Sequence, residues 1–233
     1  MNKTVVITGG AVGIGKQLVI DFAKKGFNII FSYFKHENEA KDLKEFIKNN
    51  YEVNCDIFKF DIRKEEEIKE FYDFTINKYN MVDILINNIG YASDNYIDDK
   101  TKEEFMNVLE INVCGTFLVT KYFYKNVTNC IVNISSLDAV SSYNPISMDY
   151  CASKAGVNSL TKNFALEFKN LKVISVMPKW TNTEEVQKMN PEYLKEELKR
   201  TNQDSLDDVG YVSNRIIEYI FDDNVISGDI LKI

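Results

Sequence analysis

Metal-binding residues are scarce in this sequence. It contains one histidine, His36, in 233 residues, and its four cysteines are widely spaced with no C-x-x-C pair. Protein zinc sites are built from histidine and cysteine ligands at short spacings, so we expect no metal site. Cysteines without a framework of regular spacings are typical of a chain whose thiols stay reduced. We therefore expect a cytoplasmic protein with no resident metal.

Clusters of basic residues and long apolar runs are also absent. The 28 Lys and Arg residues are outnumbered by 35 Asp and Glu, which gives a net charge of −7, and no basic stripe stands out. Nucleic-acid binding requires clustered cations that neutralise phosphates, so no such partner is expected. No apolar run could cross a bilayer, and the N-terminus shows no signal peptide, so we expect no membrane partner.

Short apolar runs alternate with helical patterns along the whole chain. The runs lack the polar–apolar alternation of half-exposed strands, which indicates strands buried on both faces of a parallel sheet. We predict about seven strands, at residues 5–7, 28–32, 57–60, 84–86, 130–134, 172–177 and 226–233. This alternation predicts an α/β fold with a doubly wound, mostly parallel sheet and helices on both faces. Residues 1–233 are interpreted as one domain.

Three further features concern the later half of the chain. Thr101 and Glu104 form a capping box that opens a long helix, with apolar residues at helical spacing as far as Tyr122. Ser205 is a candidate N-cap for the last helix. Before it lies a polar segment, residues 182–204, with six carboxylates and four cations over 184–204. A polar excursion directly after a sheet strand predicts a substrate lid.

A glycine-rich turn follows the first predicted strand and precedes an amphipathic helix. In such a unit the glycines let the pyrophosphate of a dinucleotide approach the backbone, and the helix N-terminus favours negative charge. A tight packing turn is the alternative, but the position between buried strand and helix favours dinucleotide binding. The residues assigned to this role are Gly9, Gly10, Gly13, Ile14 and Gly15.

The end of the second strand favours NADP(H) over NAD(H). Folds that prefer NAD place an acidic residue here, which hydrogen-bonds the ribose 2′-hydroxyl. This chain has Lys35 and His36 at this point and no carboxylate before Glu37. A missing carboxylate and a nearby ammonium suit a 2′-phosphate, so Lys35 is assigned to cofactor binding. The alternative is a solvated lysine in a surface loop.

A tyrosine and a lysine form a candidate catalytic pair. Tyr150 and Lys154 are four residues apart in a segment with a helical pattern, so their side chains project from one face. A phenol with its ordinary pKa near 10 is a poor acid or base at neutral pH, and a nearby cation lowers that pKa. The strand predicted at 130–134 brings Ser135 and Ser136 to its carboxyl end, where open α/β sheets bind ligands. By itself the pair is also common on surface helices.

In combination these motifs resemble the short-chain dehydrogenase/reductase family, whose members are compact NAD(P)(H) oxidoreductases with a single Rossmann-fold domain. The resemblance spans nearly the whole chain. The residues that carry it, in order, are Thr8-Gly9-x-x-x-Gly13-Ile14-Gly15, Asp61, Asn87-Asn88-x-Gly90, Asn112, Ser136, Tyr150-x-x-x-Lys154, Pro178 and Thr183.

The resemblance implies a role for each matching residue. Tyr150 is the general acid in reduction and the general base in oxidation, and Lys154 lowers its pKa and bonds the nicotinamide ribose. Ser136 polarises the substrate carbonyl, with Ser135 as the rival serine, and Asn112 holds a water of the proton relay. The remaining contacts implied by the family pattern are those of Asp61 and Ile62 with the adenine, Asn88 and Gly90 with the cofactor, and Thr183 with the carboxamide.

The chain departs from the family pattern at four places. Ile89 stands where alanine is usual, and its bulk is expected to crowd the cofactor. Lys179 replaces the glycine after Pro178, which puts the local turn in question. The segment 124–129 is short for the family, and the C-terminus lacks the usual glycine pair. Each catalytic residue is retained, so we expect an active enzyme.

The implied activity is interconversion of a carbonyl and a secondary alcohol by hydride transfer, nearest to the 3-oxoacyl-carrier-protein reductase-like branch. The acidic 184–204 segment offers no evident dock for an acidic carrier protein, so a sugar, polyol or other small-alcohol dehydrogenase stays open. A non-catalytic dinucleotide sensor or scaffold is the alternative of another class. A nucleotide-sugar epimerase would need a larger substrate domain. The family pattern also implies a homodimer or homotetramer, formed through the helices bearing Asn112 and Tyr150.

Overall fold

The apolar runs of the sequence form a seven-stranded sheet in the order β3-β2-β1-β4-β5-β6-β7, in which every adjacent pair is parallel. The structure is a computed structural model that describes residues 2–233. Its strands are β1 (Thr4–Ile7), β2 (Asn28–Tyr33), β3 (Cys55–Lys59), β4 (Val82–Asn87), β5 (Val127–Ile134), β6 (Lys172–Met177) and β7 (Ile230–Lys232). The predicted doubly wound α/β fold is confirmed.

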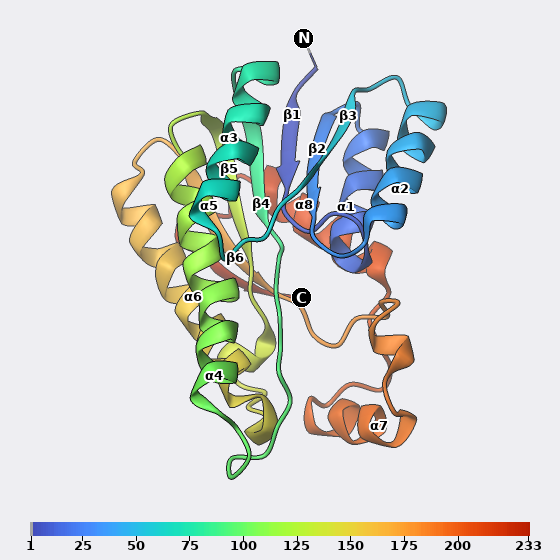
Figure 1. Ribbon diagram of the computed structural model, residues 1–233, viewed down its shortest axis with the longest axis vertical. Coiled ribbons are helices and arrows are strands. Elements are labelled where there is room, and N and C mark those ends of the chain that lie inside the picture. The colour runs from blue at the N-terminus through green and yellow to red at the C-terminus, as the bar shows by residue number, and fades with distance from the viewer. Residues whose placement is uncertain (1) are drawn as a thin grey trace.

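Helices cover both faces of the sheet (Figure 1), and each face has its own apolar core. The core on one face is built with α1, α2 and α8, and the core on the other face with α3, α5 and α6. The helices are α1 (Gly13–Lys24), α2 (Glu37–Asn50), α3 (Glu65–Tyr79), α4 (Lys102–Leu109), α5 (Gly115–Phe123), α6 (Met148–Glu167), α7 (Pro191–Arg200) and α8 (Val209–Phe221). Among residues 2–233, none of these helices has the length and apolarity needed to span a bilayer.

The chain reverses its direction of winding between β1 and β4. From β1 it proceeds through β2 to β3 at one edge, and from β4 it proceeds to β7 at the other. The loops that leave the carboxyl ends of β1 and β4 therefore run to opposite sides and leave a crevice between them, the usual ligand position in such sheets. This crevice is where the predicted site residues converge.

The helix expected to run from residue 101 to 122 is interrupted. The capping box of Thr101 and Glu104 is present, and the Thr101 hydroxyl accepts from the Glu104 N–H at 3.1 Å. A π-helical turn, Glu110–Cys114, then separates α4 from α5. Such turns insert one extra residue and change which side chains face inward, and they occur frequently at functional sites. Asn112 lies in this turn and is fully buried.

Two boundaries near the C-terminus differ from the predictions. The N-cap of α8 is Asp208, whose carboxylate accepts from the Tyr211 N–H at 2.9 Å, so the assignment of Ser205 was wrong. A short bridge between Thr181 and Asp207 extends the loop past Ser205 before the helix begins. The last strand covers only Ile230–Lys232, because the chain turns at Gly228 with φ of +94° before it joins β6.

Candidate active site

A cavity of about 820 Å³ occupies the crevice at the carboxyl ends of the strands. Most of the predicted site residues line it, and three do not: Gly10, Gly15 and Asn112 lie behind its wall. The predicted residues that line the cavity are Gly9, Gly13, Ile14, Lys35, Asp61, Ile62, Asn88, Gly90, Ser136, Tyr150, Lys154 and Thr183.

The glycine-rich turn requires its glycines for conformation and for close approach. Gly9 and Gly13 have φ of +68° and +57°, which residues with a Cβ adopt at a cost. A Cβ on Gly15 would lie 2.2 Å from the carbonyl oxygen of Gly9. The turn is therefore packed tightly against the first turn of α1, and that helix N-terminus faces the cavity. This arrangement fits the pyrophosphate of a dinucleotide.

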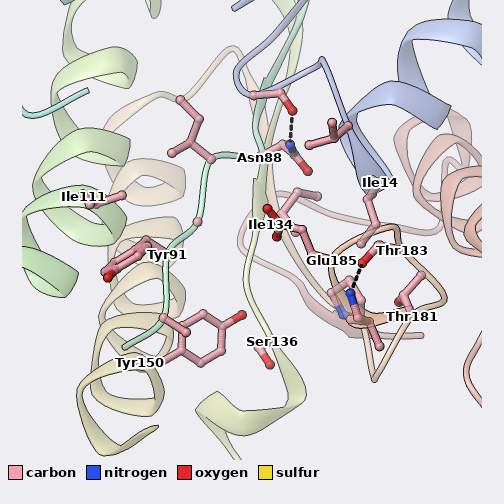
Figure 2. Close-up of a pocket in the computed structure, with 18 of the residues that line it drawn as sticks. Ile14, Asn88, Tyr91, Ile111, Ile134, Ser136, Tyr150, Thr181, Thr183 and Glu185 are labelled. Carbon is pink, nitrogen blue, oxygen red and sulfur yellow. Dashed lines mark hydrogen bonds between the residues drawn. The ribbon is translucent and has the colours of Figure 1, made fainter. Parts of the chain in front are cut away.

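Asn88 joins the glycine-rich turn to the end of β4. Its side-chain amide donates to the backbone oxygens of Thr8 at 3.0 Å and Gly9 at 2.9 Å, and Figure 2 draws one of these hydrogen bonds. Its own backbone N–H donates to the Thr8 hydroxyl at 3.0 Å. The side chain that the family pattern places beside the cofactor thus also fixes the shape of the turn that would hold it.

Glu184 reaches the glycine-rich turn from the segment after β6. Its carboxylate accepts from the Gly13 backbone N–H at 3.1 Å and from the Lys16 ammonium at 3.1 Å. These contacts help to hold the pKa of Glu184 below its ordinary value, against the opposing effect of burial. A carboxylate of the chain therefore uses one of the anion-binding donors at the start of α1.

The far end of the cavity carries the residues predicted to contact the adenosine part of the cofactor. Lys35 is exposed at its rim, and Asp61 and Ile62 line it beyond β3. Arg63, which the sequence analysis missed, binds the Asp61 carboxylate through Nε at 2.9 and 3.1 Å and lies 6.0 Å from the ring of Phe34. Its position directly after the Asp61–Ile62 pair at a strand end was the available signal.

Lys154 lies beneath Tyr150 on one face of α6, as the i, i+4 spacing predicted. Its ammonium is 5.6 Å from the centre of the Tyr150 ring and donates to the Ile134 carbonyl at 2.7 Å. Lys154 is 3% exposed, and this burial lowers its pKa to about 8. Gly90 leaves the space for it, because a Cβ there would lie 3.1 Å from the ammonium nitrogen.

The electrostatic environment of Tyr150 differs from the expectation. Burial in the cavity wall raises the pKa of the phenol, and the negative charge of Asp138 raises it further, while a hydrogen bond with Ser136 opposes them. The net shift of the Tyr150 pKa is therefore upward, opposite to the lowering expected from Lys154. The physical reason is that the buried ammonium is directed to the Ile134 carbonyl.

The two candidate serines are directed to different partners. Ser135 is buried, and its hydroxyl donates to the backbone oxygen of Lys154 at 3.0 Å. The Ser136 oxygen accepts from the Asp138 N–H at 3.1 Å and points into the cavity beside Tyr150 (Figure 2). The Ser136 hydroxyl thus faces both Tyr150 and the cavity, and this geometry favours Ser136 as the serine that meets the substrate.

Asn112 pairs both N–H groups and one oxygen lone pair of its side-chain amide within the protein. The NH₂ group donates to the Tyr91 carbonyl and to the Ser153 hydroxyl, both at 2.8 Å. The amide oxygen accepts from the Tyr91 N–H at 2.8 Å. Ser153 in turn donates to the Tyr150 carbonyl at 2.7 Å. The side chain thus holds the loop after Gly90 against α6, and the second lone pair of its amide oxygen is the side-chain position left for a relay water.

The two departures at the cavity are accommodated locally. Ile89 is partly buried in the core formed with α3, α5 and α6, although it also lines the cavity. Lys179 needs no left-handed backbone, since the residues other than glycine with positive φ within 2–233 are Asn80 and Asn202. The turn after Pro178 therefore forms without the usual glycine.

A polar wall that the sequence analysis missed lies beyond Tyr150. Asp94, Asp138, Asn144 and Tyr193 line this part of the cavity. The Asn144 amide donates to the Glu197 carboxylate at 3.2 Å and to the Tyr193 hydroxyl at 3.4 Å, which ties the loop before α6 to α7. The position of Asp138, two residues after Ser136, was the one signal for this wall. Among residues 2–233, no three His, Cys, Asp or Glu side chains are grouped as metal ligands.

The sequence and the fold match known proteins over most of their length. A family model described as short chain dehydrogenase matches residues 3–194. The 3-oxoacyl-(acyl-carrier-protein) reductase FabG of Thermotoga maritima is 32% identical over 84% of this chain and 80% of its own. A 3beta-hydroxysteroid dehydrogenase of Eggerthella lenta is 29% identical over 91% and 81%. The solved structure of ElxO with NADP bound covers 100% of this chain and 97% of its own, with a TM-score of 0.83 and 27% identity. This chain belongs to the short-chain dehydrogenase family, and it is an NAD(P)(H)-dependent oxidoreductase that interconverts carbonyl and alcohol groups.

Proposed function

We propose that the protein reduces a ketone or aldehyde to an alcohol with NADPH, with Tyr150 as the proton donor. The observation that carries the proposal is the convergence of Tyr150, Ser136 and Lys154 on one cavity that continues to the glycine-rich turn. This geometry provides an acid, a hydrogen-bond donor for a carbonyl oxygen, and a cradle for a dinucleotide within the same cavity.

Each side chain has a distinct part in the reaction. The Ser136 hydroxyl donates a hydrogen bond to the substrate carbonyl oxygen, and Tyr150 donates the proton that this oxygen gains. The NADPH cofactor, when bound, supplies the hydride that the carbonyl carbon gains. Lys154 supplies positive charge beside the phenol as negative charge develops on it. Asn112 acts as a positioning residue, since its amide holds the Tyr91 loop and α6 together.

Replacement of Tyr150 by phenylalanine tests this function. NADPH oxidation is measured against a panel of carbonyl compounds, and the Tyr150→Phe protein is expected to lose about 10²- to 10⁴-fold in kcat, the usual contribution of a positioned acid. Its NADPH affinity is expected to stay near that of the wild type. Tyr143→Phe is the matched control, because Tyr143 is 67% exposed on a loop nearby. If the wild-type protein binds NADPH but reduces no compound of the panel, the alternative function of a non-catalytic dinucleotide sensor or scaffold is supported instead.

The preference for NADP(H) is proposed from the adenosine end of the cavity. Lys35 and Arg63 supply two cations there, and the end of β2 has no carboxylate to bind a ribose 2′-hydroxyl. Lys35→Ala is expected to weaken NADPH binding about tenfold and to leave NADH binding nearly unchanged. Lys25→Ala, at an exposed position after α1, is the control. An equal loss of affinity for NADPH and NADH, or no loss for either, would contradict the preference for NADP(H).

The remaining proposals concern the assembly and its surroundings. The segment 182–204 is proposed as a substrate lid, supported by the cavity contacts of Thr183, Met189 and Tyr193.

A homodimer or homotetramer is proposed from exposed apolar residues on α5 and α6, Phe117 and Leu166. Light scattering during size exclusion tests it, and a monomer would refute it. A cytoplasmic location is supported by four unpaired cysteines.

A further inference from the structure

Carboxylates line the part of the cavity next to the catalytic pair, in addition to the Lys154 ammonium of that pair and Lys179. Asp94 and Asp138 both line it, beside Ser136 and Tyr150. Asp94 already accepts from Ser147 and, at 3.5 Å, from Tyr193. Of the two, Asp138 has the larger electrostatic effect on Tyr150, and its backbone N–H donates to the Ser136 oxygen at 3.1 Å. The negative charge of Asp138 also helps to raise the pKa of the Tyr150 phenol.

The Asp138 carboxylate is only partly satisfied within the protein. One oxygen, Oδ1, is 3.4 Å from the Arg200 guanidinium. Within residues 2–233 no hydrogen bond reaches the other oxygen, Oδ2. The Asp138 side chain is 15% exposed, and Oδ2 is accessible from the cavity. A ligand in the cavity can therefore donate a hydrogen bond to this oxygen, and a charge-assisted hydrogen bond of this kind is stronger than one between neutral groups.

Arg200 does not cancel the charge of Asp138. Its Nε donates to both oxygens of Glu197 at 3.1 Å, and Glu197 is 6% exposed. One guanidinium thus serves two carboxylates, with the better geometry to Glu197. The group of Asp138, Glu197 and Arg200 keeps one negative charge, and Asp138 is its member that lines the cavity. Low dielectric surroundings strengthen the repulsion of any anion from this place.

We propose that Asp138 determines substrate specificity, and that the substrate carries a hydrogen-bond donor, a hydroxyl or an ammonium group, close to the reacting carbon. The proposal rests on the proposed function, since it places the reacting carbon at Tyr150 and Ser136. A site built to pair a polar group of the substrate discriminates strongly against analogues that lack it. The same carboxylate selects against substrates with an anionic group at that position. Hydroxyketones, polyols and amino alcohols fit this description, and simple 3-oxo acids do not.

Oxidation of four related alcohols by NADP⁺ tests the proposal. The compounds are cyclohexanol, cyclohexane-1,2-diol, 2-aminocyclohexanol and 2-hydroxycyclohexanecarboxylate, which differ only in the neighbouring group. We expect kcat/KM for the diol or the amino alcohol to exceed that for cyclohexanol at least tenfold, and the carboxylate to be the poorest. In Asp138→Asn the ratio of amino alcohol to cyclohexanol should fall at least tenfold, while the carboxylate improves relative to cyclohexanol. Asp98→Asn, an exposed aspartate outside the cavity, should keep the wild-type ratios.

The outcomes separate this proposal from the proposed function. The role of Asp138 would be overturned if the wild type prefers cyclohexanol or the carboxylate. It would also be overturned if Asp138→Asn changes kcat/KM equally for all four compounds. The oxidoreductase function would stand in both cases. If no compound is oxidised, binding of the four to the NADP⁺-loaded protein is measured by saturation-transfer NMR. Binding of the diol or amino alcohol that Asp138→Asn abolishes would support the proposal, and absent or equal binding would overturn it.

Discussion

The Lys154 ammonium donates to the carbonyl oxygen of Ile134, the last residue of β5, at 2.7 Å. Lysine in an unfolded chain has a pKa near 10.4, and burial lowers the pKa of Lys154 to about 8. Between these two pKa values the unfolded chain binds more protons than the folded protein. The contribution of Lys154 to the free energy of unfolding therefore rises with pH over this window.

Lys154→Met should remove this pH dependence. We expect the free energy of unfolding of the wild type to rise relative to that of the variant between pH 7.5 and pH 10, by a few kcal/mol at most, because each pKa unit is worth about 1.4 kcal/mol. Urea unfolding at the two pH values measures it. Lys169→Met, at an exposed position after α6, should track the wild type at both. A difference between wild type and Lys154→Met that is constant with pH would contradict the prediction.

The pH profile of alcohol oxidation should respond to Asp138. Oxidation requires Tyr150 as a base, so its rate rises with pH through the pKa of the phenol in the complex. The negative charge of Asp138 contributes to raising that pKa. Asp138→Asn removes the charge, and the acidic limb of the kcat profile should move to lower pH. The shift should be absent in Asp98→Asn, and an unmoved or oppositely shifted limb in Asp138→Asn would refute this coupling.

The amide of Asn112 should contribute to stability through the Tyr91 backbone. Asn112→Ala leaves the Tyr91 N–H and carbonyl without the partners they have at 2.8 Å. An unpaired polar group costs about 1–3 kcal/mol when it is buried, and Tyr91 is 42% exposed, so we expect a loss of about 1–3 kcal/mol in the free energy of unfolding. Asn163→Ala removes an exposed amide on α6 and should cost less than about 1 kcal/mol. Equal losses in both variants would show that the Tyr91 contacts are dispensable.

The strands, the glycine-rich turn and the Tyr150–Lys154 pair were predictable because each depends on residues close in sequence. Gly9, Gly13 and Gly15 signal their backbone geometry within eight residues, and the i, i+4 spacing fixes a shared helix face. The local rules failed where a distant partner decides the structure. The N-cap of α8 moved from Ser205 to Asp208 because the chain before it first pairs with Thr181.

The pKa shifts of the site residues were less predictable than the identity of those residues. The sequence places an ammonium beside a phenol, but the direction of the pKa shift depends on what else surrounds both groups. Burial and Asp138 raise the pKa of Tyr150, and the Ile134 carbonyl takes the Lys154 ammonium. Arg200 and Asp138 are 62 residues apart in the sequence, and their contact joins α7 to the loop between β5 and α6. No local pattern marks such a pair, because its members meet only after the chain has folded.

The position of Glu184 leads to a prediction about cofactor affinity. Its carboxylate accepts from the Gly13 N–H and the Lys16 ammonium, each at 3.1 Å, and so neutralises positive charge at the start of α1. The phosphates of NADPH are favoured by that same positive charge. Glu184→Gln keeps an oxygen that can accept from Gly13 but removes the negative charge. We therefore expect the dissociation constant for NADPH to fall about three- to tenfold, measured by titration of nucleotide fluorescence.

The control for this prediction is Glu192→Gln, which changes the same charge at an exposed position in the first turn of α7. Since simple screening of charge acts over about 10 Å at 0.1 M salt, a remote carboxylate should alter affinity little. The gain in Glu184→Gln should also shrink as salt is raised, because its cause is electrostatic. A weaker affinity in Glu184→Gln would show the opposite role: the carboxylate would then hold the segment after β6 in the geometry that binding requires.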